Sequence, residues 1–404
     1  MDTDIAVVGG GPAGTFSALF AAKSGAKVTV FEEHPTIGSP THCAGHVSLS
    51  GLKQLGLKLP PSLVENTFRS ATFFSPSSKR FSVHFASPVT CTINRELLDQ
   101  HLAQIASRKG TRFLLSSRAK LVIERQNGTK ESARFVISVQ GETKKIKPSL
   151  IIDAEGISST ILKNEGLKPF DDKMVVKAVS AELDQIRDIE NDTVEIYLGS
   201  EFADGFYAWI IPKRDGTAKV GLGTRHGNPR LCLERFKNNH SIAYNKMRKS
   251  RITRIAYHSI PLGGPIPKTY ASGFLAAGDA ASQVKPTTGG GIIIGLTCAK
   301  IAGEVAASAV KEGTFSDKFL KRYEDRWKQS VEFDMRIMLS ARKLLNRLSD
   351  REMDKVFDIA NKLRLQESLI QVKNVDFSKE ELIRLVKSPP ALATLACLLF
   401  SAFI

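Results

Sequence analysis

The sequence predicts an α/β protein in which a discontinuous Rossmann-like dinucleotide-binding domain is interrupted by a mostly β domain and followed by a helical C-terminal region. Three observations predict this fold class. Residues 1–40 read as strand, glycine turn, helix and strand, and strand-like runs dominate residues 111–257. An α/β pattern then returns at residues 273–279, before helical periodicity begins near residue 311.

The opening unit has the pattern that seats a dinucleotide pyrophosphate at a helix N-terminus. An apolar run at residues 5–8 leads into the turn Gly-Gly-Gly-Pro-Ala-Gly at residues 9–14. A helical segment and a second apolar run, residues 28–31, follow. Because a strand precedes the turn and a helix follows it, we interpret the motif as a dinucleotide site rather than a glycine-rich turn of an ordinary α/β protein.

Four residues of this unit have defined expected roles. We expect Gly9 to permit the tight turn, Gly11 to let phosphates approach the backbone, and Gly14 to let helix and strand pack closely. Glu32 follows the second apolar run, where its carboxylate is placed to accept ribose hydroxyls.

The elements after this unit are mostly strands. Residues 73–85 read as two strands around a polar turn, and apolar residues at helical spacing predict a helix over residues 95–109. Further strand-like runs follow at residues 113–115, 120–124, 134–139 and 150–152, and through residues 172–257.

A second glycine turn lies far along the chain. The apolar run at residues 274–277 leads to Asp279, and Thr-Thr-Gly-Gly-Gly-Ile at residues 287–292 opens a helix over residues 293–307. Asp279 is placed to accept hydroxyls from a polyol chain, which a nicotinamide dinucleotide lacks and a flavin carries as its ribityl group. The two turns together therefore predict FAD, with the second set of glycine amides facing the flavin pyrimidine edge.

These patterns set the expected domain boundaries. The FAD-binding domain is expected to comprise residues 1–65, 88–165 and 258–310, the β-rich substrate-binding domain residues 66–87 and 166–257, and the helical C-terminal region residues 311–404.

The C-terminal region contains two patterns. Aromatic and apolar residues recur at every fourth position from Phe315 to Met335, which predicts an amphipathic helix docked on the other domains. Residues 388–404 carry no charge and are mostly apolar after two prolines. Because a spanning helix needs about 20 residues, we expect this tail to form either a buried helix or an interfacial membrane anchor.

The composition of the chain limits the classes of binding partner and the cellular compartment that we expect for the protein. The 404 residues carry a net charge of +16, which either attracts polyanions and anionic membrane surfaces or serves only to keep the protein soluble. The basic residues are scattered, without a stripe of interleaved aromatics, so we expect no nucleic-acid partner. The five cysteines are odd in number and lack zinc or CxxC spacing, which favours a reducing, cytoplasmic compartment and no metal site. The chain begins directly with a strand, so we expect no secretory signal.

Several motifs resemble those of the FAD-dependent geranylgeranyl reductase family, within the para-hydroxybenzoate hydroxylase-like flavoprotein group. The first glycine turn and the Gly-Asp pair at Asp279 are common to the whole group. Three motifs look specific to the reductases: Cys-Ala-Gly at residues 43–45, Tyr-Ala-Trp-Ile-Ile-Pro at residues 207–212, and Lys-Pro-Thr-Thr-Gly-Gly-Gly-Ile at residues 285–292. The chain departs from the family pattern at Asp204, where proline is usual, and at Ile211, where phenylalanine is usual.

The resemblance implies roles for the matching residues around FAD. Ala13 and Ala119 would contact the nucleotide through their backbone, Glu32 would bind the adenosine ribose, and Arg95 would lie along the phosphates or the ribityl chain. The residues expected beside or over the isoalloxazine ring are Cys43, Ala44, Gly45, Asp279, Gly290, Gly291 and Ile292. Tyr207 and Trp209 would line a channel for an isoprenoid chain.

The reaction that the resemblance implies is hydride delivery from reduced flavin to an isolated alkene of a prenyl lipid, with NAD(P)H or ferredoxin as electron donor. Because such an alkene accepts hydride poorly, we expect early protonation by Cys43 or a held water. Aromatic faces such as those of Tyr207 and Trp209 would stabilise the developing cation. A prenyl lipid resides in a membrane, so we expect a cytoplasmic enzyme that associates with the membrane surface. Two other functions fit the sequence: an aromatic monooxygenase of the same fold, and a non-catalytic prenyl-binding protein.

Overall fold

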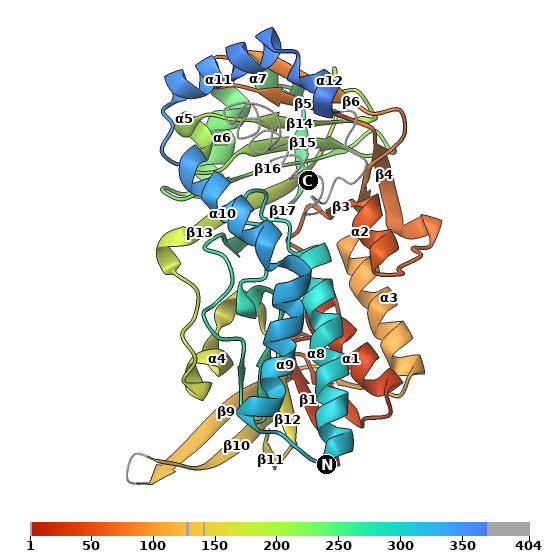
Figure 1. Cartoon of the computed structure of the whole chain (residues 1–404). Coiled ribbons are helices and arrows are strands. Elements are labelled where there is room, and N and C mark those ends of the chain that lie inside the picture. Colours follow the sequence, from red (N-terminus) through yellow and green to blue (C-terminus); the bar gives the residue numbers. More distant parts are fainter. Residues whose placement is uncertain (1, 127–128, 140–141, 370–404) are drawn as a thin grey trace.

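The computed structural model describes residues 2–126, 129–139 and 142–369 (Figure 1). The apolar tail at residues 388–404, for which we expect a buried helix or a membrane anchor, lies outside the described residues. Two large sheets, one below the other in Figure 1, are joined by a small third sheet and flanked by helices.

The lower sheet confirms the predicted discontinuous Rossmann-like fold, because its strands come from widely separated parts of the chain. Neighbouring strands are parallel, except that β18 is antiparallel to β19. Its six strands, in spatial order, are β18 (Tyr270–Ala271), β19 (Phe274–Ala276), β12 (Leu150–Asp153), β1 (Ile5–Val8), β2 (Val28–Phe31) and β8 (Arg112–Leu114). The central strand β1 is apolar throughout because both faces of the sheet are covered.

Helices cover one face of this sheet and a second, antiparallel sheet packs near the other. On the first face, α1 (Pro12–Lys23) lies between α8 (Ile292–Glu312) and α3 (Arg95–Arg108). A Cβ at Gly303 on α8 would lie 2.2 Å from the Ser17 carbonyl oxygen, so glycine is needed where α8 meets α1. The opposite side carries β9 (Ser117–Gln126), β10 (Thr129–Val139), β11 (Glu142–Ile146) and α4 (Thr160–Glu165).

Among the described helices, α8 is the one whose length and apolar composition would allow it to cross a membrane, with a mean hydropathy of 1.5. Yet 67% of its apolar window is buried inside the fold, where α8 packs against α1 and α9. Burial against protein accounts for the apolar composition of this helix.

The upper sheet is antiparallel except for the parallel pair β14 and β5. Its seven strands, in order, are β17 (Arg251–Pro261), β13 (Val175–Asp184), β16 (Ala218–Thr224), β15 (Ala208–Pro212), β14 (Thr193–Tyr197), β5 (Ser70–Phe74) and β6 (Arg80–His84). Side chains alternate between two cores, as Ala208 and Ile210 against Trp209 and Ile211 show. One core lies under α5 (Ser200–Ala203), α6 (Pro229–Asn239) and α7 (Ser241–Met247).

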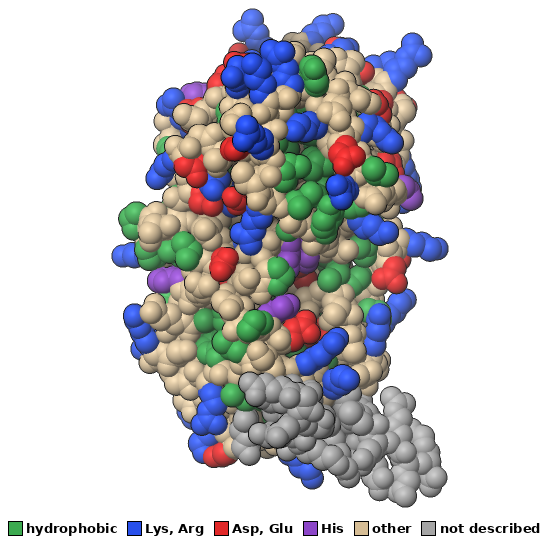
Figure 2. Space-filling view, turned by 180° about the vertical axis from the view of Figure 1, so that it is seen from behind, with side chains coloured by type: hydrophobic (Ala, Val, Ile, Leu, Met, Phe, Trp, Pro, Cys, Tyr) green, Lys and Arg blue, Asp and Glu red, His purple; other side chains and the backbone are tan. Residues whose placement is uncertain are grey.

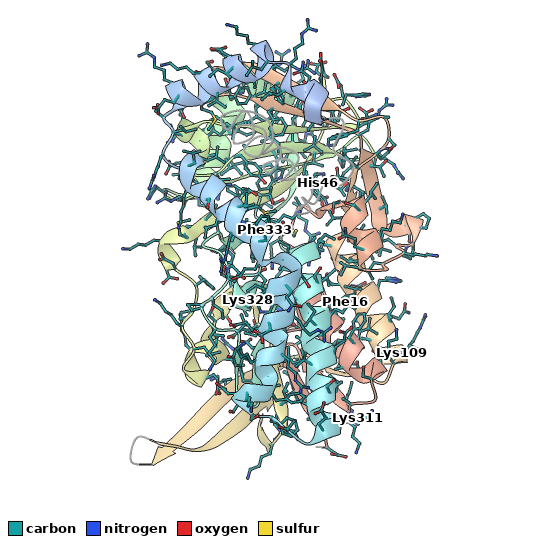
Figure 3. The ribbon with its side chains drawn as sticks, viewed as in Figure 1. Phe16, His46, Lys109, Lys311, Lys328 and Phe333 are labelled. Carbon is teal, nitrogen blue, oxygen red and sulfur yellow. The ribbon has the colours of Figure 1, made fainter. Side chains whose placement is uncertain are left out.

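A three-stranded sheet joins these two parts of the molecule. It comprises β3 (His46–Ser48), β7 (Thr90–Ile93) and β4 (Val64–Phe68), and it is accompanied by α2 (Leu49–Gln54) and the 3-10 turn η1 (Pro61–Leu63). His46 lies at this junction between the upper and lower parts (Figure 3). Further 3-10 turns are η2 (Gly156–Ser158), η3 (Asp172–Met174) and η4 (Gly278–Ala281).

Up to residue 369, the C-terminal region is helical, as predicted, but a π-helical turn interrupts the expected amphipathic helix. The region comprises α9 (Asp317–Trp327), the π turn η5 (Lys328–Glu332), α10 (Phe333–Leu345), α11 (Asp350–Lys362) and α12 (Leu365–Leu369). A four-residue repeat drifts by about 40° per step around a regular α-helix. The wider turn at η5 opposes this drift, so Met335 still packs in the same core as Phe319, Tyr323 and Trp327.

Candidate functional site

A cavity of about 480 Å³ extends from the first glycine turn to the inner face of the upper sheet. In the view from behind, hydrophobic and histidine side chains surround a hollow between the upper and lower parts (Figure 2). The cavity brings together all but one of the predicted site residues: Gly9, Gly11, Ala13, Glu32, Cys43, Ala44, Gly45, Arg95, Ala119, Tyr207, Trp209, Asp279, Gly290, Gly291 and Ile292. Their individual roles toward a cofactor or substrate stay predictions.

The first glycine turn leaves the N-terminus of α1 open to the cavity. Gly9 has φ +96°, and a Cβ there would lie 2.3 Å from the Ala154 carbonyl oxygen. Gly11 caps α1 without a side-chain hydrogen bond, and a Cβ at this position would meet no atom within 4 Å. The free backbone amides and the open space above them fit a pyrophosphate.

Gly14, the remaining predicted residue, does not line the cavity. A Cβ at Gly14 would lie 1.9 Å from the Gly9 carbonyl oxygen, so the absence of a side chain lets the helix pack against the turn. Gly14 therefore allows the close packing that shapes the turn, although it does not form part of the cavity surface.

The Glu32 carboxylate is fixed at the carboxyl end of β2, beside the turn. Its Oε2 accepts a hydrogen bond from the Gly10 backbone N–H at 2.7 Å, and its Oε1 accepts one from the His34 N–H at 2.9 Å. Oε1 also lies 2.6 Å from His34 Nδ1. Because an ionised carboxylate has about four acceptor sites, two on each oxygen, Oε2 retains capacity for a ribose hydroxyl.

The second glycine loop is held by the upper sheet and by the C-terminal region. The Tyr207 hydroxyl donates to the Thr288 carbonyl at 2.7 Å. The buried Arg342 guanidinium, on α10, donates to the carbonyls of Pro286 (2.9 Å) and Thr287. Burial lowers the pKa of Arg342 to about 10. Sequence reasoning missed Arg342, because a single arginine in an amphipathic helix gives no signal of such a role.

Asp279 lies where the second loop meets the cavity. A Cβ at Gly291 would lie 3.1 Å from Asp279 Oδ1, so the carboxylate rests against the backbone that opens α8. His258 of β17 approaches the same carboxylate, with 3.6 Å between His258 Nε2 and Asp279 Oδ2. His258 also stacks on His42 at 4.7 Å between ring centroids, and burial, followed by the neighbouring His258, lowers the pKa of His42 to about 4. Through this histidine pair, the edge of the upper sheet contributes to the site. Sequence reasoning missed His258, because it belongs to no recognisable motif.

The segment around Cys43 is surrounded by buried charge. Cys43 Sγ accepts the Gly45 backbone N–H at 3.3 Å. Arg95 binds the buried Asp99 carboxylate at 3.1 Å, one helical turn along α3. Burial alone would lower the pKa of Arg95, but Asp99 and Cys43 raise it above its usual value. A fixed cation therefore lies beside the Cys43 thiol.

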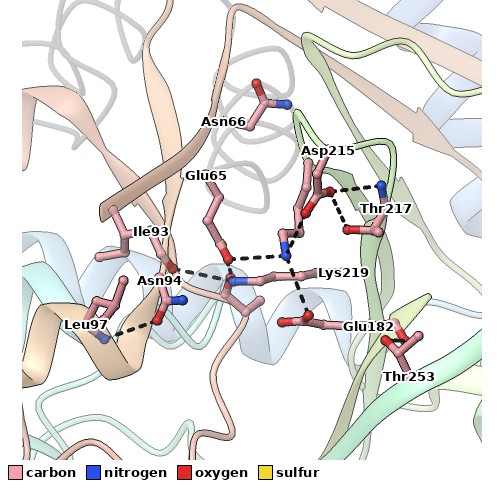
Figure 4. Close-up of polar contacts among 12 residues, drawn as sticks. Glu65, Asn66, Ile93, Asn94, Leu97, Glu182, Asp215, Thr217, Lys219 and Thr253 are labelled. Atoms are coloured by element: carbon pink, nitrogen blue, oxygen red, sulfur yellow. Dashed lines mark hydrogen bonds and ion pairs between the residues drawn. The ribbon is translucent and has the colours of Figure 1, made fainter. Parts of the chain in front are cut away.

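Lys219, on β16, links the upper sheet to this segment (Figure 4). Its Nζ donates to the Ala44 carbonyl at 3.0 Å and to the Ile93 carbonyl at 3.4 Å, and it forms an ion pair with Glu65. Lys213 lies 3.5 Å from the same Glu65 carboxylate. These contacts hold the loop that follows Cys43 against the upper sheet.

Aromatic side chains form the wall of the cavity on the upper sheet. Phe206 and Tyr207 stack with 4.2 Å between ring centroids, and Tyr207 meets Trp209 edge-on at 6.0 Å. Two glycines of β16 make room for these rings, since a Cβ at Gly221 would lie 2.4 Å from Trp209 and one at Gly223 2.6 Å from Phe206. Burial raises the pKa of Tyr207. The wall is apolar and adjoins the two glycine loops.

The described part of the chain contains no group of three or more His, Cys, Asp or Glu side chains placed to hold a metal ion. The chemistry that the cavity offers is instead that of a nucleotide cradle and an apolar, aromatic compartment, with the Cys43 thiol and the histidines His42 and His258 in the same lining.

Comparison with known proteins places this arrangement among flavoproteins. The family profile described as FAD binding domain matches residues 2–333. The chain is 34% identical over 354 residues to a digeranylgeranylglycerophospholipid reductase of Methanocaldococcus jannaschii, covering 87% of this chain and 88% of that protein. It is 34% identical over 393 residues to digeranylgeranylglycerophospholipid reductase 2 of Methanothermobacter thermautotrophicus, covering 97% and 98% of the two chains. A crystal structure of a geranylgeranyl bacteriochlorophyll reductase-like protein from Thermoplasma acidophilum superposes with a TM-score of 0.84 at 26% identity, covering 98% of this chain and 99% of that one.

Proposed function

Because the chain belongs to the FAD-binding-domain flavoproteins, and among them to the family of the archaeal digeranylgeranylglycerophospholipid reductases, we propose that it saturates carbon–carbon double bonds in the geranylgeranyl chains of membrane glycerolipids. FAD is its cofactor, as the family and the nucleotide cradle at Gly11 and Glu32 both support. The observation that carries the proposal is the continuity of the cavity from that cradle to the aromatic wall of the upper sheet.

Reduced FAD, once bound, would supply the hydride for the reaction. The apolar wall would hold the prenyl chain, because burying an extended hydrocarbon releases about 25 cal/mol for each Å² removed from water. Phe206, Tyr207 and Trp209 would place ring faces beside carbon atoms that become positively charged as the alkene is protonated.

Cys43 is the proposed proton donor, because it lines the same cavity as the nucleotide cradle and the aromatic wall. Donating the Sγ proton leaves a thiolate, which the neighbouring Arg95 guanidinium and the Gly45 N–H are placed to stabilise. Tyr207 is a poorer candidate, because its hydroxyl already donates to the Thr288 carbonyl.

We further propose that either NAD(P)H or a ferredoxin supplies the electrons that reduce the flavin. A cytoplasmic location with association at the membrane surface follows from the lipid nature of the substrate.

The test is product analysis with purified, FAD-loaded protein. After reduction with dithionite, addition of a digeranylgeranyl glycerolipid should give products heavier by two hydrogens for each reduced bond. A hydroxylated product that requires oxygen would instead indicate a monooxygenase, and a colourless protein that binds the lipid would indicate a non-catalytic carrier.

Cys43→Ala should lower turnover by about 10²–10⁴-fold, the usual contribution of a general acid, while the flavin spectrum stays unchanged. Cys91→Ala is the matched control, because Cys91 is buried away from the cavity and burial raises its thiol pKa to about 12. Full turnover in the Cys43 variant with bound flavin would exclude Cys43 as the proton donor.

A further inference from the structure

Residues 248–257, which include the start of β17, form a strip that is both basic and apolar. The strip contains Arg248, Lys249, Arg251 and Arg254 and has no acidic residue. All four cations are exposed. Between and after them lie Ile252, Ile255 and Tyr257, with exposed fractions of 47%, 39% and 48%.

Two helices on the same side of the sheet carry further exposed hydrophobic side chains. Ile255 and Tyr257 pair with Ala181 and Val179 of β13, so they point to the face of the sheet where those two residues pack under α6 and α7. Leu231 on α6 and Tyr244 on α7 are also exposed. Residues 231–257 therefore carry five of the eleven large hydrophobic side chains that are exposed in the described chain.

Protection of a sheet edge does not account for the strip. β17 is an edge strand, and arginines commonly shield such edges from pairing with another chain. Edge protection alone would favour charged or short side chains along the whole strand. This strand instead exposes Ile252, Ile255 and Tyr257. Arg248 and Lys249 also precede the strand, outside its hydrogen-bonding edge.

The two acidic side chains of the adjacent strand β13, Glu182 and Asp184, offset only part of the four positive charges of the strip. On the adjacent β13, Asp184 Oδ1 accepts the backbone N–H of Arg251 at 3.0 Å, and Glu182 pairs with Lys213 at 3.5 Å. Cations combined with exposed aliphatic and aromatic side chains suit the surface of an anionic bilayer. The cations would attract the negatively charged headgroups, and the apolar side chains would enter the boundary of the acyl chains.

The same strand also forms a wall of the cavity. His258 and Ile260 of β17 line the large cavity, and Arg254 and Ala256 line a smaller pocket beside Cys43. From these observations we infer that residues 248–257, with Leu231 and Tyr244, dock the protein on a bilayer containing anionic lipids. This inference rests on the proposed function, since it places the edge of the lipid-binding cavity next to the membrane.

The test is sedimentation of full-length, FAD-loaded protein with phosphatidylcholine vesicles, with and without phosphatidylglycerol. Wild-type protein should bind the anionic vesicles, and binding should weaken as added salt shortens the screening length. Each basic residue near an anionic surface contributes about fivefold in affinity, so Arg248→Gln/Lys249→Gln/Arg251→Gln should weaken binding by roughly a hundredfold.

The matched control removes three exposed cations elsewhere, as Arg108→Gln/Lys109→Gln/Arg112→Gln. Lys109 lies at the far end of α3 in the lower part of the molecule (Figure 3), so this variant should bind vesicles as wild type does. Ile255→Ser/Tyr257→Ser should also weaken binding, and in high salt its loss should exceed that of the charge variant.

Equal binding by the strip variant and the control would overturn the inference. Failure of the wild-type protein to bind anionic vesicles would also overturn it, and is the result expected if the strip contacts an acidic protein instead. A strip variant whose oligomeric state differs from that of the wild type would overturn it as well, because the strip would then be an interface between copies of this chain. Lipid reduction in detergent micelles separates the two proposals. The strip variants should keep wild-type turnover there, whereas failure of the wild type to reduce micellar lipid would refute the proposed function and leave the vesicle result standing.

Discussion

The buried ion pair between Lys219 and Glu65 allows a quantitative prediction about how the loop after Cys43 is held. Lys219→Met removes the donor to the Ala44 carbonyl and leaves Glu65 with Lys213, whose Nζ lies 3.5 Å away. The Lys219 and Glu65 side chains are only 6% and 11% exposed. Breaking a buried pair of this kind costs about 3–5 kcal/mol, and we expect a loss near 3 kcal/mol because Lys213 remains.

Urea unfolding of the apo protein measures this loss, and a flavin titration measures its effect on the site. Losing one charged hydrogen bond to the Ala44 loop, worth about 1.5–3 kcal/mol, should weaken FAD binding at least tenfold. The control is the double variant Glu65→Gln/Lys219→Met, which leaves no buried carboxylate short of a partner. The double variant should therefore be more stable than Lys219→Met alone.

Two results would refute this reasoning. One is a Lys219→Met variant whose free energy of unfolding lies within about 1 kcal/mol of wild type, the range of an exposed ion pair. The other is a double variant that is less stable than the single variant, which would show that the carboxylate is not the source of the loss.

Three further predictions concern the cradle, a junction histidine and the second loop. Gly11→Ala should lower apo stability by no more than about 1 kcal/mol, the usual cost of alanine at a helix N-cap, because its Cβ meets no atom within 4 Å. The same change should prevent flavin binding. Gly14→Ala, with its Cβ 1.9 Å from a carbonyl oxygen, should lower the Tm of the apo protein more strongly. Unchanged flavin affinity in Gly11→Ala would contradict the placement of the pyrophosphate. Burial lowers the pKa of His46 to about 4, below its unfolded value near 6.5. The stability of the protein should therefore fall as the pH drops from about 6.5 toward 4. His46→Gln should show a smaller fall in Tm over this interval, and an equal fall would count against the burial of a neutral imidazole. Arg342→Lys keeps the charge but loses the planar set of donors, so hydrogen exchange in residues 285–291 and flavin dissociation should both accelerate, whereas unchanged rates would show that the loop is held without Arg342.

The parts of the site that follow local rules could be predicted from the sequence. The turn at Gly9 and Gly11 depends on backbone freedom and on the strand and helix beside it, and these features are visible within a few residues. The second loop at Gly291 could be found for the same reason. The domain boundaries assigned from sequence stay predictions, and the strands β4 (Val64–Phe68) and β17 (Arg251–Pro261) each run across one of them.

The residues that sequence reasoning missed act across long sequence separations. Lys219 bonds to Ala44, which lies 175 positions away, and Arg342 bonds to Thr287 across 55 positions. His258 reaches Asp279 from an edge strand whose other side chains are largely exposed. Each contact depends on how two sheets and a helix are packed together, and neither periodicity nor motif spacing encodes that packing.

The clamp formed by Arg342 has a consequence for the biosynthesis of the protein. A nascent chain that has emerged from the ribosome only as far as α8 already contains both glycine turns, but it lacks the guanidinium that fastens Pro286 and Thr287. Flavin capture is therefore expected to follow completion of the polypeptide, as a late maturation step, and a chain cut short before α10 would accumulate as an empty, protease-sensitive form.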